Sequence, residues 1–152
     1  YIRLLAEYLK HQPRFRPFLD DETIDLLCKS APLHDIGKVG VSDRILLKPG
    51  KLTDQEFEEM KRHTLYGRDT ILAAEKKLGG TSFLRVAREI AYTHHERWDG
   101  SGYPEGLKGE QIPVPGRLMA LADSYDALTS QRVYKAGIRH EKAGRENRGP
   151  RA

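Results

Sequence analysis

The sequence predicts an all-α fold. Along its 152 residues, strict alternation of apolar and polar side chains, the pattern of a half-buried strand, is almost absent. Apolar residues recur instead at the period of an amphipathic helix, about 3.6 residues. The sequence is 38% hydrophobic and 32% charged, which is typical of a globular protein, and its length suits one domain with a single core.

Two helices are expected in the first third of the chain. The first covers about residues 1–10 and stops near Pro13. The second begins at residues 21–23 and is bent or ended near Pro32. The first helical pattern is already under way at Tyr1, so we expect the chain to be a piece of a longer protein.

The best-marked helix start lies at Thr53. Thr53 and Glu56 have the spacing of a capping box, in which each side chain bonds the main chain of the other residue. The helix that begins there is expected to run to about His63, and a further helix to Leu78, where Gly79 and Gly80 suit a C-cap.

Two more helices complete the prediction. The first carries a stripe at helical spacing that ends at His94 and places this histidine on the buried face: Phe83, Val86, Ala87, Ile90 and Ala91. Residues 96–116 are rich in glycine and proline and lack the helical period of apolar residues, so they are predicted to form a long functional loop. The last helix covers about 117–128, with an expected buried face of Leu118, Leu121, Ala122, Tyr125 and Leu128.

The net charge of +4, from 26 basic and 22 acidic residues, first suggests an anionic partner. Residues 136–152 hold five basic and two acidic side chains, so +3 of this charge belongs to the tail. The remainder is nearly neutral, which argues against a nucleic-acid polymer as the partner.

No stretch reaches the roughly 18–20 apolar residues of a membrane span, and no secretory signal is visible. The single cysteine, Cys28, lies in an apolar helical stripe and has no partner for an internal disulfide. We interpret it as a small buried hydrophobe, which favours a reducing compartment and a cytoplasmic protein.

Histidines and aspartates carry the chemistry of this sequence. Imidazole nitrogen and carboxylate oxygen together suit iron, manganese or zinc. Taken singly, the residues have ordinary explanations: a lone His-Asp pair is weak evidence, a single buried histidine is more often a core residue, and an aspartate such as Asp123 or Asp126 can lie on a solvated edge. Together they exceed one tetrahedral site and indicate two metals with a bridging ligand. The six candidates are His34, Asp35, His63, His94, His95 and Asp123.

The order of these motifs resembles the HD-GYP family, bacterial phosphodiesterases of the HD superfamily that hydrolyse cyclic di-GMP. The resemblance rests on a His-Asp-Ile-Gly-Lys run at 34–38, His63, a His-His-Glu run at 94–96, an Asp-Gly-Ser-Gly-Tyr-Pro run at 99–104 and the segment 122–130. Each motif is modest alone, but the five in series are highly specific, and they cover the chain from residue 1 to about 135.

The resemblance implies an HD-superfamily helical bundle with a metal site in its core. The six candidates fall on the family's ligand positions, with Asp35 as the expected bridge between two or three divalent ions, usually iron or manganese. Lys38 matches a lysine near the scissile phosphate, so Asp35 and Lys38 are the expected catalytic residues. The expected substrate contacts are Lys38, the loop residues Gly102, Tyr103 and Pro104, and Arg132 and Lys135 of an R-x-x-K segment. The product would be linear pGpG, and in some members GMP.

Two departures from the family are visible. A further histidine, and in some members a glutamate, stands upstream of the positions that match residues 1–9, and family members continue after the R-x-x-K segment into closing helices. We therefore expect residues 1–135 to form a partial HD-GYP domain, truncated at both ends, and residues 136–152 to be a basic, disordered tail. The activity of this piece is left open.

Three other functions compete with a cyclic di-GMP phosphodiesterase. They are a module that binds cyclic di-GMP without cleaving it, an HD phosphohydrolase acting on another nucleotide, and a metal-free helical interaction domain. Family members commonly follow a receiver or sensory domain, as in two-component systems, and such a domain is the expected partner. Dimerisation through it is left open.

Overall fold

The computed structural model describes residues 1–129. Within them the secondary structure is helical apart from one isolated β-bridge, between Asp99 and Lys108, so the all-α prediction is confirmed. The α-helices are α1 (Ile2–Leu9), α2 (Asp21–Ser30), α3 (Asp43–Leu46), α4 (Asp54–Lys61), α5 (His63–Leu78), α6 (Ser82–Thr93) and α7 (Val114–Thr129). Short 3₁₀ turns are η1 (Ala31–Leu33), η2 (Ile36–Gly40) and η3 (Gly109–Gln111). Arg132, Lys135 and the predicted tail lie outside the described residues.

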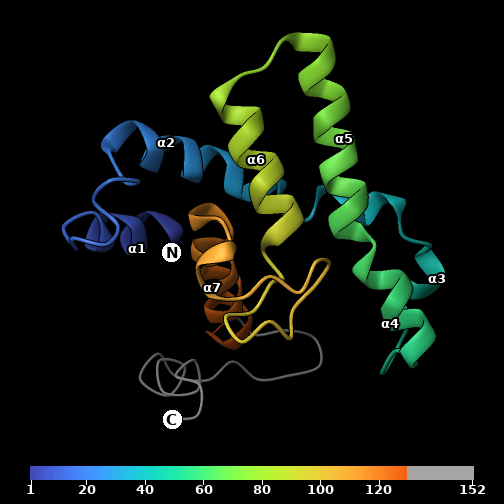
Figure 1. The fold of residues 1–152 in the computed structure, drawn as a ribbon. Coiled ribbons are helices and arrows are strands. Elements are labelled where there is room, and N and C mark those ends of the chain that lie inside the picture. The colour runs from blue at the N-terminus through green and yellow to red at the C-terminus, as the bar shows by residue number, and fades with distance from the viewer. Residues whose placement is uncertain (130–152) are drawn as a thin grey trace.

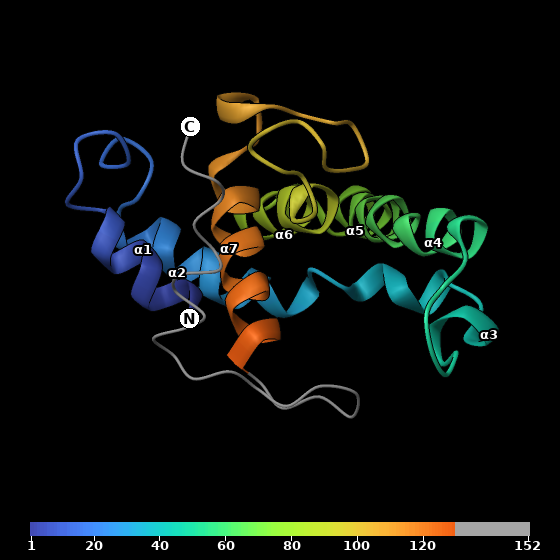
Figure 2. The ribbon, with the colours of Figure 1, turned by 90° about the horizontal axis from the view of Figure 1, so that it is seen from below.

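Helix α6 is central to the arrangement. It contacts α2, α5 and α7, and the antiparallel pair α5 and α6 forms one side of the molecule (Figure 1). Helix α1 packs on α2 and α7. The segment that contains η2 runs alongside α5, as the second view shows (Figure 2). The end of α6, the start of α5 and the residues after α2 therefore lie close together.

Two clusters of buried apolar side chains hold these helices. The larger joins α1, α2, α6 and α7 through Ala6, Leu19, Ile24, Leu27, Val86, Ile90, Leu118 and Met119. The smaller joins α5 and α6 through Ile71, Ala87 and Ala91. Because α6 contributes residues to both clusters, its C-terminal end is held from two sides.

The helix-end signals predicted from the sequence are present. The Thr53 hydroxyl accepts a bond from the Glu56 amide at 3.3 Å, and the Glu56 carboxylate accepts one from the Thr53 amide at 2.7 Å, so the capping box is confirmed. Helix α5 ends at Gly79, whose φ of 80° suits glycine.

Two details of α7 differ from the prediction. The helix begins at Val114, earlier than the expected start, because Pro115 takes an early position where its missing N–H costs nothing. Leu121 is 41% exposed instead of buried. The buried stripe is centred on Leu118, Met119 and Ala122, and Leu121 lies about 110° from that centre at 100° per residue.

Two further predictions concern the burial of Cys28 and the absence of a membrane-spanning helix. Cys28 is half-buried and packs against the larger cluster, as a small hydrophobe would. Among the residues described, none of the helices has the length and apolar character needed to cross a bilayer.

Candidate metal centre

The adjacent residues His34 and Asp35 lie between two 3₁₀ turns. His34 follows η1, and Asp35, with φ −102° and ψ 10°, precedes η2. The backbone here is not a regular α-helix. This local geometry places the His34 Nε2 and the Asp35 Oδ2 only 3.3 Å apart, although the two residues are neighbours in the chain.

A glycine brings this segment onto α5. A Cβ added to Gly37 would lie 2.0 Å from the His63 carbonyl oxygen and 2.3 Å from the Gly67 nitrogen. Only a residue without a side chain permits such an approach. The contact between η2 and α5 thus sets the distance between Asp35 and His63.

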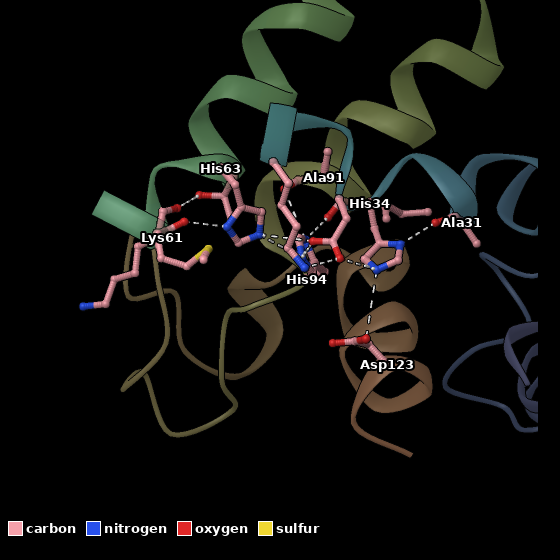
Figure 3. Close-up of polar contacts among 12 residues, drawn as sticks. Ala31, His34, Lys61, His63, Ala91, His94 and Asp123 are labelled. Carbon is pink, nitrogen blue, oxygen red and sulfur yellow. Dashed lines mark hydrogen bonds and ion pairs between the residues drawn. The ribbon is translucent and has the colours of Figure 1, made fainter. Parts of the chain in front are cut away.

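Asp35 lies at the centre of the group, within 4 Å of the imidazoles of His34, His63 and His94, which Figure 3 shows. Its Oδ1 is 3.4 Å from the His63 Nε2 and 3.7 Å from the His94 Nε2. Its Oδ2 is 3.3 Å from the His34 Nε2 and 2.6 Å from the Lys38 Nζ. The two carboxylate oxygens therefore face different sets of neighbours.

Main-chain carbonyls orient three of the imidazoles. The Nδ1 of His34 meets the Ala31 oxygen and the Nδ1 of His63 meets the Met60 oxygen, each at 2.8 Å, while the Nδ1 of His94 meets the Ile90 oxygen at 3.0 Å. Because a carbonyl only accepts, each Nδ1 carries the proton. In the neutral form of each ring the Nε2 then presents a lone pair to the centre, as in metal-binding histidines.

The donor set fits a divalent metal ion. Asp35, His63, His94 and His95 each offer one atom, and these atoms lie within 4.8 Å of one another. The Asp35 Oδ1 is buried and has no hydrogen-bond partner. The Nε2 lone pairs of His63 and His94 face each other at 3.4 Å. A cation between these groups would satisfy all of them, and nitrogen and oxygen donors suit a transition metal.

Electrostatics favours the metal-binding protonation states. Burial lowers the pKa of His63, and burial with the neighbouring His94 and His63 lowers the pKa of His95 to about 3. Burial alone would raise the pKa of Asp35, but the neighbouring His34, His94 and Lys38 side chains outweigh it and hold that pKa far below its usual range. Neutral imidazoles beside a carboxylate are the form that binds metals.

His34 and Asp123 lie on the other side of Asp35. Burial would lower the pKa of His34, but its bonds to Asp35 and Ala31 outweigh this and raise that pKa. The Asp123 Oδ1, on α7, is 4.0 Å from the His34 Nε2. The structure thus gathers the six predicted ligand residues in one place, with Asp35, His63, His94 and His95 in one tight cluster and His34 and Asp123 at its edge.

The predicted loop residues lie beside this centre. The Tyr103 ring stacks on His95, with centroids 4.8 Å apart, and burial raises the pKa of the Tyr103 hydroxyl. A Cβ on Gly102 would lie 2.3 Å from the Arg97 nitrogen, so the loop folds tightly back on the chain. Pro104 follows in the same loop. Gly102 and Tyr103, with His94 and His95, line a pocket of about 420 Å³.

Glu96 holds this loop, a role that the sequence analysis missed. Its side chain is buried, and its two oxygens accept bonds from the amides of Glu105 at 2.8 Å and Leu107 at 2.9 Å. The only available signal was an acidic residue directly after two histidines on a buried face. Through these bonds Glu96 keeps Tyr103 over His95.

Known proteins are similar to this chain in sequence. A cyclic di-GMP phosphodiesterase of Vibrio cholerae is 59% identical over 143 residues, 94% of this chain and 29% of that protein. A cyclic di-GMP phosphodiesterase of Thermotoga maritima is 54% identical over 117 residues, 77% of this chain and 30% of that protein. A 3′3′-cGAMP-specific phosphodiesterase of V. cholerae is 47% identical over 117 residues, 77% of this chain and 22% of that protein.

The chain spans less than a third of the length of these three relatives. The names of the first two agree with the resemblance to cyclic di-GMP phosphodiesterases that the motifs indicated. The profile of the HD domain matches residues 19–146, which is most of the chain. The chain therefore belongs to the HD domain family.

Proposed function

We propose that this chain is the catalytic part of a phosphodiesterase that hydrolyses cyclic di-GMP to linear pGpG. The cluster of Asp35, His63, His94 and His95, with the unpartnered Asp35 oxygen at its centre, is the observation that carries the proposal. The high identity to cyclic di-GMP phosphodiesterases supports the substrate.

Asp35 and the five residues around it would hold at least two divalent ions, with iron or manganese as the expected metals. Asp35, His63, His94 and His95 would hold one ion, and Asp35, His34 and Asp123 would hold another. When bound, such a pair supplies an activated water and neutralises charge on the phosphate oxygens during in-line displacement.

Lys38 contributes a positive charge at the same place. Its Nζ is 2.6 Å from the Asp35 Oδ2, and the side chain is 39% exposed. A phosphate that enters the centre would therefore meet a lysine ammonium as a donor. Charge-assisted hydrogen bonds of this kind stabilise the negative charge that develops on phosphate oxygens. We assign further phosphate contacts to Arg132 and Lys135, which lie outside the described residues.

We infer the domain organisation from the motifs, which end near residue 135, whereas the HD-domain match runs on to residue 146. Residues 1–135 would form the catalytic domain and residues 136–152 a separate basic tail. The relatives are much longer than this chain, and one of them, in Xanthomonas campestris, is a cyclic di-GMP phosphodiesterase response regulator. A receiver or sensory domain is accordingly the partner that we propose, in a cytoplasmic protein.

The decisive experiment measures metal content and product together. Wild-type protein loaded with Mn²⁺ or Fe²⁺ should contain about two ions per chain and release pGpG. Asp35→Asn should lose the bound metal and the release of pGpG, because Asp35 lies at the centre of the donor atoms. Asp69→Asn, on the exposed surface of α5, should retain both properties. Metal and cyclic di-GMP binding without any pGpG would indicate a sensor and contradict the proposal.

A further inference from the structure

The pocket beside the metal centre has an outer wall that the metal ligands do not form. His94 and His95 lie at its inner end, and Phe57, Lys61 and Tyr103 line it further out. The inner end is therefore shared with the metal centre. A substrate whose phosphate lies at Asp35 would place an attached group in this pocket.

The wall carries flat aromatic surface. Tyr103 stacks on His95 and meets Phe57 edge to face, with ring centroids 6.2 Å apart. Phe57 is 44% exposed although it is a large apolar residue. Exposed aromatic rings along a nucleotide pocket are suited to stacking on a base.

Lys61 lies over this aromatic wall. Its Nζ is 5.0 Å from the centre of the Phe57 ring and 5.6 Å from that of Tyr103. In Figure 3 its side chain extends away from the imidazoles, and Lys61 is among the residues that line the pocket. Its ion pair with Glu58 at 2.6 Å involves a carboxylate that is 69% exposed, and such a pair is easily exchanged for a ligand.

The charged side chains of the pocket are two cations and one carboxylate, and its hydroxyl groups can donate or accept. Lys61 and Arg97 can only donate. Glu96 is the only carboxylate among the described lining residues, and both of its oxygens are occupied by the Glu105 and Leu107 amides. Guanine presents two acceptors, O6 and N7, on one edge, whereas adenine has an amino group at the position of O6. The two cationic side chains therefore match the O6 and N7 edge of guanine better than the corresponding edge of adenine.

We propose that Lys61 contacts the O6 and N7 edge of a guanine base and sets the preference of the enzyme for guanine over adenine. This rests on the proposed function, since it takes the substrate phosphate to lie at the metal centre. Lys61 then determines specificity and takes no part in bond cleavage.

The test compares Lys61→Ala, Lys61→Arg and, as a matched control, Lys77→Ala on the exposed end of α5. We measure kcat/KM for cyclic di-GMP and cyclic di-AMP with the Mn²⁺-loaded proteins, together with their metal content. Binding of 5′-GMP and 5′-AMP, measured by calorimetry on the same proteins, gives a second readout that does not depend on catalysis.

Lys61→Ala should lower kcat/KM for cyclic di-GMP about tenfold and leave that for cyclic di-AMP within about twofold, with unchanged metal content. Lys61→Arg should keep the guanine preference, because arginine donates to the same edge, and Lys77→Ala should match wild type. An equal loss on both substrates, or an unchanged preference in Lys61→Ala, would overturn the proposal. If the wild type cleaves neither substrate, the proposed function fails. The binding measurement still decides the role of Lys61, because the wild type should prefer GMP to AMP and Lys61→Ala should not.

Discussion

Replacing Gly37 by alanine should open the metal centre without touching a ligand. The added Cβ would lie 2.0 Å from the His63 carbonyl oxygen, and an ordinary contact needs at least 3.4 Å, so η2 and α5 must separate by about 1.4 Å. Both obstructing groups belong to the main chain of α5, so no side-chain rotation relieves the clash. Asp35 precedes Gly37 by two residues and would move away from His63.

The expected losses can be stated in order of magnitude. Overpacking of this kind costs about 1–3 kcal/mol, which corresponds to a fall in Tm of roughly 3–10 °C for a chain of this size. Metal sites tolerate errors of only about 0.2 Å in ligand distance, so metal content should fall much more than stability.

The assay is elemental analysis of the purified protein beside thermal unfolding followed by circular dichroism. Gly80→Ala is the matched control, because a Cβ there would meet nothing closer than 3.8 Å. If Gly37→Ala bound as much metal as the wild type, the η2–α5 contact would not set the position of Asp35, and the reasoning would be refuted.

Three other predictions follow from the same structure. Glu96→Gln should leave one loop amide unpaired, at a cost of about 1–3 kcal/mol, and raise KM for cyclic di-GMP at unchanged metal content; equal KM values would show that Glu96 does not position the loop. The Glu56 pKa is lowered to about 2, first by its bond from Lys48 and next by that from the Thr53 amide, so its stabilising contribution is complete above the usual pKa of 4.5 and disappears as pH falls towards 2. Glu56→Gln should accordingly reduce the acid-induced fall in Tm over that range, and an unchanged pH profile would contradict this. Chelation of metal from the loaded protein should lower its Tm, because free metal at 1,000 times its Kd stabilises the folded state by about 4 kcal/mol. The Tm of Asp35→Asn should not respond to the chelator.

Helix positions were readable from the sequence because they depend on local signals. The capping box at Thr53 and the glycine after Leu78 are satisfied within one turn of chain, and both helix ends lie where these signals put them. The apolar stripe that ends at His94 also placed that histidine correctly inside the molecule. The prediction that Leu121 is buried was wrong because the width of a buried stripe depends on which neighbours cover the helix, and the sequence does not show this.

The candidate site was predictable as a set of residues and not as a geometry. Histidines and aspartates of the right kinds are visible in the sequence, and their order identified the family. The approach of Gly37 to Gly67 and the bonds from Glu96 to the loop are contacts between segments distant in sequence or within an irregular loop. No periodicity encodes such contacts, so they emerge only from the three-dimensional structure.

The position of α6 has a consequence for protein engineering. This helix fills two hydrophobic clusters at once, and His94 follows directly at its end. Transplanting the histidine pair into another helical scaffold would therefore require copying both packed faces of α6 as well as the ligands. A graft that supports only one face would leave the imidazoles free to rotate with the helix end. The smallest segment that could be transplanted therefore includes α6 together with the helices that pack on it, α2, α5 and α7.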